Sequence, residues 1–72
     1  MKEREFKKIL VEYLNGNGLT QAKFADKIGV KAGHVGDWAR GKSKPGYDML
    51  KRLVIAFYET PIEYWLGLDE NY

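Results

Sequence analysis

The sequence predicts an all-α fold in which five short helices form one compact domain, residues 1–72. Apolar residues recur at intervals of three and four along most of the chain, which is the spacing of a helix face turned to a core. Glycine, asparagine and proline interrupt this spacing often enough to keep each helix short. The chain has 72 residues and no cysteine, so regular helix packing rather than disulfides must stabilise its small core.

The first predicted helix covers residues 2–14. Its apolar residues lie on one face at helical spacing: Phe6, Ile9, Leu10, Tyr13 and Leu14. The Asn-Gly-Asn-Gly run at residues 15–18 is expected to end this helix, because these residue types favour turns. Lys7 and Lys8 lie on its other faces, where we interpret them as solvated charges, with contact to DNA phosphates as the alternative.

The second and third predicted helices, residues 20–28 and 31–40, are separated by a turn at Gly29. Thr20 is the expected N-cap, because its hydroxyl can accept a hydrogen bond from a free amide of the first turn. Gly29 stands where the chain must turn with a positive φ. The residues expected to face inward are Phe24, Ala25 and Ile28 on the first of these helices and Val35 and Trp38 on the second.

The order of these residues resembles the lambda-repressor-like helix-turn-helix family of phage repressors and small bacterial regulators. The matching pattern is Gln21-x3-Ala25-x3-Gly29-x5-Val35-x2-Trp38, with apolar Phe24, Ile28 and Val30 between its fixed positions. A small residue allows two helices to cross closely, the glycine makes the tight turn, and the apolar residues hold one helix on the other. The resemblance covers nearly the whole chain after residue 5 and implies that the second and third helices form the helix-turn-helix.

Two more helices are predicted, at residues 46–57 and 61–66. The core face of the first is expected to comprise Tyr47, Leu50, Leu53, Val54 and Phe57, with Ile55 off this face. Thr60 is the expected N-cap of the second helix, and Gly67 is expected to close it.

The C-terminal end carries more apolar surface than so small a core is expected to hide. Packing of Trp65 and Leu66 onto the first helix accounts for part of this surface. A two-fold dimer contact, as in family members that pair through this end, is compatible with such packing. The candidate dimer contacts are Ile55, Tyr64, Trp65 and Leu68, and Tyr72 adds to the same surface.

The charge of the chain is unevenly distributed. Residues 1–44 carry ten Lys or Arg against five acids, a charge of +5, whereas residues 45–72 carry two bases against five acids, a charge of −3. The basic part contains the helix-turn-helix pattern, and basic side chains that neutralise phosphates supply most non-specific affinity for DNA. The asymmetry therefore favours a nucleic-acid partner, although a solvated surface with chance asymmetry is the alternative.

The resemblance implies that residues 31–40 are the recognition helix, which enters the major groove of DNA. It also implies that Gln21, at the start of the preceding helix, hydrogen-bonds a DNA phosphate and a neighbouring residue of the recognition helix; a polar residue that only favours the first turn is the alternative. The candidate DNA-binding residues are Gln21, Lys31, Ala32, Gly33, His34, Asp37, Arg40, Lys42 and Lys44. The last three lie in or next to a basic loop suited to phosphate contacts.

The recognition helix departs from the family pattern in ways that reduce the number of base-reading side chains. Lys31 replaces the usual Ser or Thr cap, and Ala32 and Gly33 replace longer polar residues. Gly36 is expected on the DNA-facing side. Asp37 can accept a hydrogen bond from a cytosine amine, and it repels phosphate when no base partner is in reach. Direct readout is therefore expected to be sparse, with DNA shape contributing more.

No catalytic site, metal site or cofactor is predicted. His34 and Asp37 have the spacing of half a metal site or of an acid–base pair, but no third ligand, nucleophile or glycine-rich phosphate loop accompanies them. No long apolar run predicts a membrane span and no secretory segment is present, so we expect a cytoplasmic protein.

The leading functional hypothesis is a sequence-specific, double-stranded-DNA-binding transcriptional regulator, a repressor of the kind used by phages and mobile elements. A homodimer would place two recognition helices about 34 Å apart, so its operator would be an inverted repeat. Two alternatives stay open: a protein-interaction module that keeps the fold without binding DNA, and an antitoxin.

Overall fold

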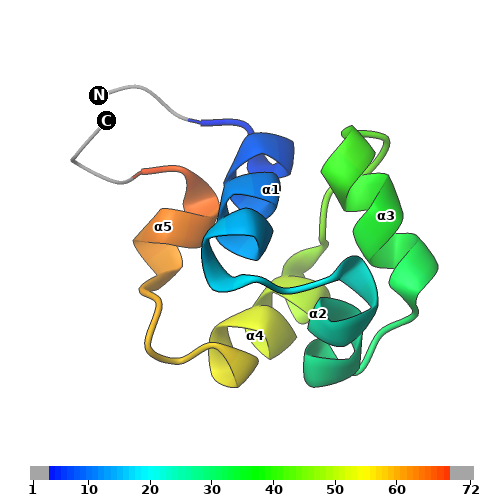
Figure 1. Ribbon diagram of the computed structural model, residues 1–72. Helices are drawn as coiled ribbons and strands as arrows, with labels where there is room; N and C mark the ends of the chain where they lie inside the picture. The colour runs from blue at the N-terminus through cyan, green and yellow to red at the C-terminus, as the bar shows by residue number, and fades with distance from the viewer. Residues whose placement is uncertain (1–3, 69–72) are drawn as a thin grey trace.

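The computed structural model describes residues 4–68, which contain five α-helices and no strand. The helices are α1 (Phe6–Asn17), α2 (Gln21–Ile28), α3 (Ala32–Arg40), α4 (Tyr47–Ala56) and α5 (Ile62–Leu66). The prediction of an all-α, five-helix fold with a helix-turn-helix in its second and third helices is confirmed. α1 packs against both α3 and α5, which lie on its two sides, while α2 packs against α3 and α4 (Figure 1).

The core is built around aromatic rings contributed by four helices and the end of α4. Phe24 of α2 stacks on Phe57 with the ring centroids 4.9 Å apart, and Tyr13 of α1 lies 4.7 Å from Trp65 of α5. Each ring of this size stabilises the fold by roughly 1.5–3 kcal/mol when it is fully buried. The buried core residues are Ile9, Leu10, Leu14, Phe24, Ala25, Ile28, Val35, Trp38, Leu53, Phe57 and Trp65.

The turn between α2 and α3 is held by local and tertiary hydrogen bonds. The Thr20 hydroxyl accepts from the Lys23 amide at 3.1 Å, which confirms Thr20 as the N-cap of α2. Gly29 ends the helix with φ 75°, as expected, and its carbonyl accepts from Arg52 of α4 at 3.0 Å. The turn is therefore tied to α4 as well as to its own helices, and this fixes how α3 is presented.

The bounds of α1 differ from the predicted 2–14. At its start, Glu5 is an extended N-cap and the Arg4 amide donates to the Gly67 carbonyl at 3.1 Å, so these residues join the end of α5 instead of the helix. Residues 2 and 3 lie outside the described part of the chain. At its end, the helix continues through Gly16 to Asn17, and Gly18 makes the turn with φ 62°.

Two expectations for the C-terminal helices were wrong. Tyr47 is 76% exposed and does not belong to the core face of α4, because α4 starts at this residue and turns Met49 and Leu50 toward the core instead. Thr60 does not cap α5: the N-cap is Pro61, and no side chain accepts from the first turn. Ile55 lies off the core face, as predicted, and Gly67 closes α5 with φ 77°.

Trp65 is a core residue and not part of a surface. Its side chain is 1% exposed and packs among Tyr13, Phe24 and Phe57. Its expected place among the dimer contacts was therefore wrong, because the small core needs this ring to fill the space between α1 and α5. Leu66, which follows it, is exposed, and Tyr72 lies outside the described residues.

Candidate nucleic-acid interface

The first turn of α3 is exposed. Lys31 is the N-cap, with an extended backbone and no side-chain cap bond, and the residues that follow it as far as His34 are exposed. Val35 and Trp38 are buried and hold the opposite side of α3 against the core, as predicted. The arrangement leaves the first turn of α3 open to a partner, with Arg40 exposed at the end of the helix.

Gly36, expected on the DNA-facing side, is covered by the side chains of Gln21 and Arg40 and is not itself open to a partner. The residue is buried where the first turn of α2 approaches α3. A Cβ atom at this position would lie 3.2 Å from Nη1 of Arg40 and 3.3 Å from Oε1 of Gln21, closer than ordinary van der Waals contact. Glycine at 36 therefore gives the Gln21 and Arg40 side chains room to lie beside the helix backbone.

Two of the candidate DNA-binding residues bind each other. Oδ1 of Asp37 accepts from Nη2 of Arg40 at 2.6 Å, an ion pair across one helical turn. The Arg40 side chain is 65% exposed and that of Asp37 34% exposed. The Arg40 guanidinium is therefore accessible, but its charge is offset and its direction is set by its neighbour.

A basic loop follows α3, and the fold places Lys7 of α1 beside it. Gly41 ends α3 with φ 77°, and Lys42 beyond it is exposed. A Cβ atom at Gly41 would lie 2.7 Å from Cδ of Lys7, so the stem of this α1 lysine crosses the end of α3. Lys7 was interpreted as a solvated charge because only the tertiary packing of α1 on α3 brings it here.

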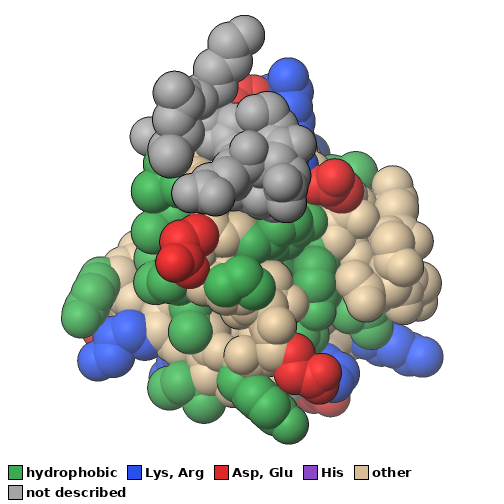
Figure 2. Space-filling model, turned by 90° about the vertical axis from the view of Figure 1, so that its left-hand side faces the viewer, with side chains coloured by type: hydrophobic (Ala, Val, Ile, Leu, Met, Phe, Trp, Pro, Cys, Tyr) green, Lys and Arg blue, Asp and Glu red, His purple; other side chains and the backbone are tan. Residues whose placement is uncertain are grey.

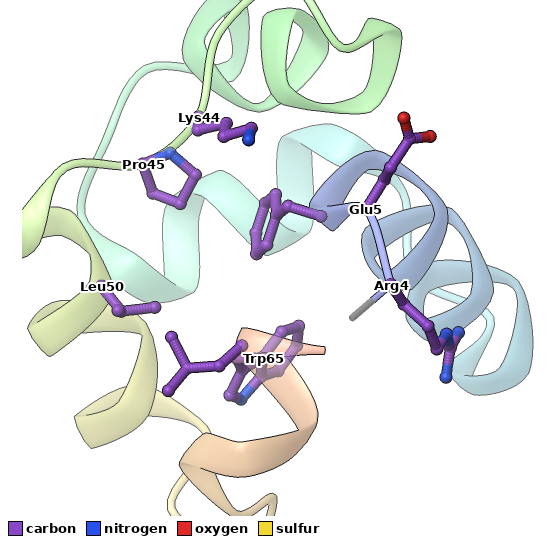
Figure 3. A pocket seen from close by; sticks show the side chains of 8 residues that line it. Arg4, Glu5, Lys44, Pro45, Leu50 and Trp65 are labelled. Atoms are coloured by element: carbon purple, nitrogen blue, oxygen red, sulfur yellow. The ribbon is translucent and has the colours of Figure 1, made fainter. Parts of the chain in front are cut away.

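Lys44 lies at the edge of a small pocket of about 230 Å³. Figure 3 shows Lys44 and Pro45 on one side of this pocket, with Arg4 and Glu5, Leu50, and Trp65 around the rest. The loop after α3 thus turns toward the start of α1, so Lys44 is placed beside α1, α4 and α5 as well as beside α3.

The described residues offer little for other chemistry. They contain no group of three or more His, Cys, Asp or Glu side chains that could hold a metal ion. Within the same range, no helix is long and apolar enough to cross a membrane. His34 is exposed on α3, and no second imidazole exists in the chain.

An exposed α3, fixed on α2 through a glycine turn and followed by a basic loop, defines a helix-turn-helix domain of the DNA-binding regulatory class. A family model described as helix-turn-helix matches residues 10–65, most of the chain, and the protein belongs to this Cro/C1-type, lambda-repressor-like family. No match is found among curated proteins or among solved structures.

Proposed function

We propose that this protein is a sequence-specific regulator of transcription that reads double-stranded DNA by placing α3 in the major groove. The observation that carries the proposal is the two-sided character of α3: Val35 and Trp38 fix one side to the core, while Lys31 to His34 stand open on the other. We propose in particular that it is a repressor of the phage or mobile-element type. It would act in the cytoplasm and have no enzyme activity.

The proposed contacts divide by chemistry. In the groove, Lys31 and His34 are hydrogen-bond donors, the Ala32 methyl group suits a thymine methyl, and Gly33 lets the backbone approach. At the DNA backbone, Gln21, Arg40, Lys42 and Lys44 are the proposed phosphate contacts, with Lys7 beside them. Because few of these side chains can distinguish bases, we propose that DNA shape contributes to specificity.

We propose a homodimer that pairs through the α4–α5 groove. This apolar groove is lined by Tyr47, Leu50, Lys51, Val54, Ile55 and Ile62. Ile55 is 73% exposed, and hydrophobic side chains gather on the face of the molecule seen from the α5 side (Figure 2). Tyr64 and Leu68 are half-buried near the end of α5 and are the remaining candidates from the sequence.

The size of the molecule agrees with such a dimer. Its Cα extents are 32 × 25 × 24 Å, and α3 lies on the far side of α1 from α5 (Figure 1). Two copies paired at the α4–α5 groove would carry their α3 helices on the outer sides of the dimer, and we propose that these helices enter successive major grooves, roughly 34 Å apart. An inverted-repeat operator is the proposed target.

The test is a fluorescence-anisotropy titration of a labelled random duplex at two salt concentrations, followed by random-site selection. We expect binding that weakens steeply with salt. Lys42→Ala should reduce the slope of log affinity against log salt by about 0.9, the loss of one phosphate contact. Lys27→Ala is the charge-matched control, because its ammonium lies 5.7 Å from the Phe57 ring centroid, toward α4.

The α4–α5 groove also favours the second candidate, a protein-interaction module or antitoxin that binds a partner chain instead of DNA. In that case the random duplex would show no binding at low salt, and no site would emerge from selection. Binding to DNA with equal salt slopes for Lys42→Ala and the unmodified protein would keep the function but reject the proposed backbone contact.

A further inference from the structure

Four residues of α2 and α3 form a cluster that the groove contacts do not explain: Gln21, Gly36, Asp37 and Arg40, here the Arg40 cluster. The guanidinium lies over Gly36, where a Cβ atom would be 3.2 Å from Nη1 and 3.7 Å from Nη2. Nη2 of Arg40 donates to Oδ1 of Asp37 at 2.6 Å. Oε1 of Gln21 lies 3.3 Å from the same Cβ position at Gly36. Gly36 and Asp37 therefore both lie against the Arg40 guanidinium, and the Gln21 amide oxygen lies near the same glycine.

The cluster changes what Arg40 can offer to DNA. An unrestrained arginine loses much conformational freedom on binding, whereas one held in place has lost part of it already. The ion pair with Asp37 also cancels most of the net charge, so attraction to phosphate in general is reduced. Directional donors remain, because a guanidinium has five N–H groups and the bond to Asp37 uses one of them.

We propose that Asp37 is a positioning residue that fixes Arg40 across Gly36, so that the free N–H edge of Arg40 meets a pair of acceptors on the DNA. Such a pair is supplied by N7 and O6 of guanine, or by two oxygens of one phosphate. This inference rests on the proposed function. It replaces the expectation that Asp37 itself reads a cytosine.

The two glycines of α3 support this assignment by their difference. A Cβ atom at Gly33 would meet nothing within 4 Å, whereas one at Gly36 would press on both Arg40 and Gln21. Only at Gly36, therefore, does the absence of a side chain make room for the Arg40 cluster.

The experiment compares affinity for the selected duplex with affinity for a random duplex. In Asp37→Ala the affinity for the selected duplex should fall about fivefold, the lower end of the value of a good bidentate contact, and the ratio should fall with it where Arg40 reads a base. Arg40→Ala should lower the ratio at least as much, and the double variant should be no worse than Arg40→Ala alone, because Asp37 acts through Arg40. Asp37→Glu, which restores the acceptor, should recover part of the loss.

A second pair of variants tests the geometry. Gly36→Ala should lower the ratio by crowding the guanidinium, whereas Gly16→Ala, a helical glycine of α1 with nothing within 4 Å, should leave it unchanged. If Arg40 reads guanine, Arg40→Ala loses one base preference in a repeated selection. If it binds phosphate, the preferences stay and the salt slope for the selected duplex falls by about 0.9.

Three outcomes would overturn the inference while leaving the proposed function intact: an unchanged affinity of Asp37→Ala for the selected duplex, a higher affinity, or losses that add in the double variant. The last would mean that Asp37 contacts DNA independently of Arg40. Failure of the unmodified protein to select any site overturns the proposed function itself, and the inference with it.

Discussion

Tyr64 links α5 to α1 through a single hydroxyl group. This group donates to Oε2 of Glu12 at 3.2 Å, and Glu12 in turn pairs with Arg4. Burial, together with the negative charge of Glu12 and the hydrogen bond to it, raises the pKa of Tyr64 from 10.0 to about 12. The folded protein therefore holds this proton more tightly than the unfolded chain does.

The raised pKa gives a stability contribution with a definite pH window. A group whose pKa is higher in the folded state contributes fully below its unfolded value, and the contribution is lost as pH rises through its folded value. We expect the difference in free energy of unfolding between the protein and Tyr64→Phe to be constant up to about pH 9 and to shrink between pH 10 and 12. Urea unfolding at a series of pH values measures it; a difference that stays constant to pH 12 would contradict the assignment.

At the scale of the element, the two threonines that precede α2 and α5 have different roles. Thr20 accepts from the first turn of α2, whereas no side chain does so for α5. Thr20→Ala should cost about 1 kcal/mol of unfolding free energy, the usual value of a lost N-cap, and Thr60→Ala should cost well below that. Chemical denaturation of both variants makes the comparison, and equal losses would mean that the α2 cap contributes little.

The sequence predicted each helix from local signals, and the helix-turn-helix best of all. Thr20, Gly29 and the inward residues of α2 and α3 follow from hydrogen-bonding capacity, positive φ and helical spacing, which neighbours in sequence determine. The start of α1 could not be predicted in this way, because the bond from Arg4 to Gly67 joins the two ends of the described chain. The exposure of Tyr47 depends in the same way on where α4 begins.

In the candidate site, too, local features could be predicted from the sequence and features that depend on tertiary packing could not. Exposure of the first turn of α3 follows from the helical spacing of Val35 and Trp38. The Arg40 cluster could not be predicted, because it depends on how closely α2 crosses α3 at Gly36 and on the conformation of a long side chain. The Asp37–Arg40 spacing was the one sequence signal available, since residues three apart lie on the same side of a helix.

At the scale of the whole molecule, the two surfaces proposed for binding lie on different sides of α1. The α3 side carries the proposed groove contacts and the basic loop, while the α5 side carries the α4–α5 groove and hydrophobic side chains (Figures 1 and 2). In the proposed dimer, DNA and the second copy would therefore not compete for one surface, which is the condition for a dimer on an inverted repeat.

Ile55→Asn tests this arrangement without changing the charge that DNA experiences. Loss of the exposed Ile55 side chain from the α4–α5 groove should weaken pairing, so that sedimentation at rising concentration shows less dimer than for the unmodified protein. Affinity for the full inverted repeat should fall, while affinity for a single half-site should stay the same, because each copy keeps its own α3.

Tyr58→Ser is the matched control for Ile55→Asn, since Tyr58 is also a highly exposed apolar residue but lies outside the groove. It should leave both affinities and the sedimentation unchanged. Equal affinity of Ile55→Asn and the unmodified protein for the full repeat would remove the groove from the dimer proposal. Equal losses on the full repeat and the half-site would instead indicate a change in the monomer, because only pairing distinguishes the two duplexes.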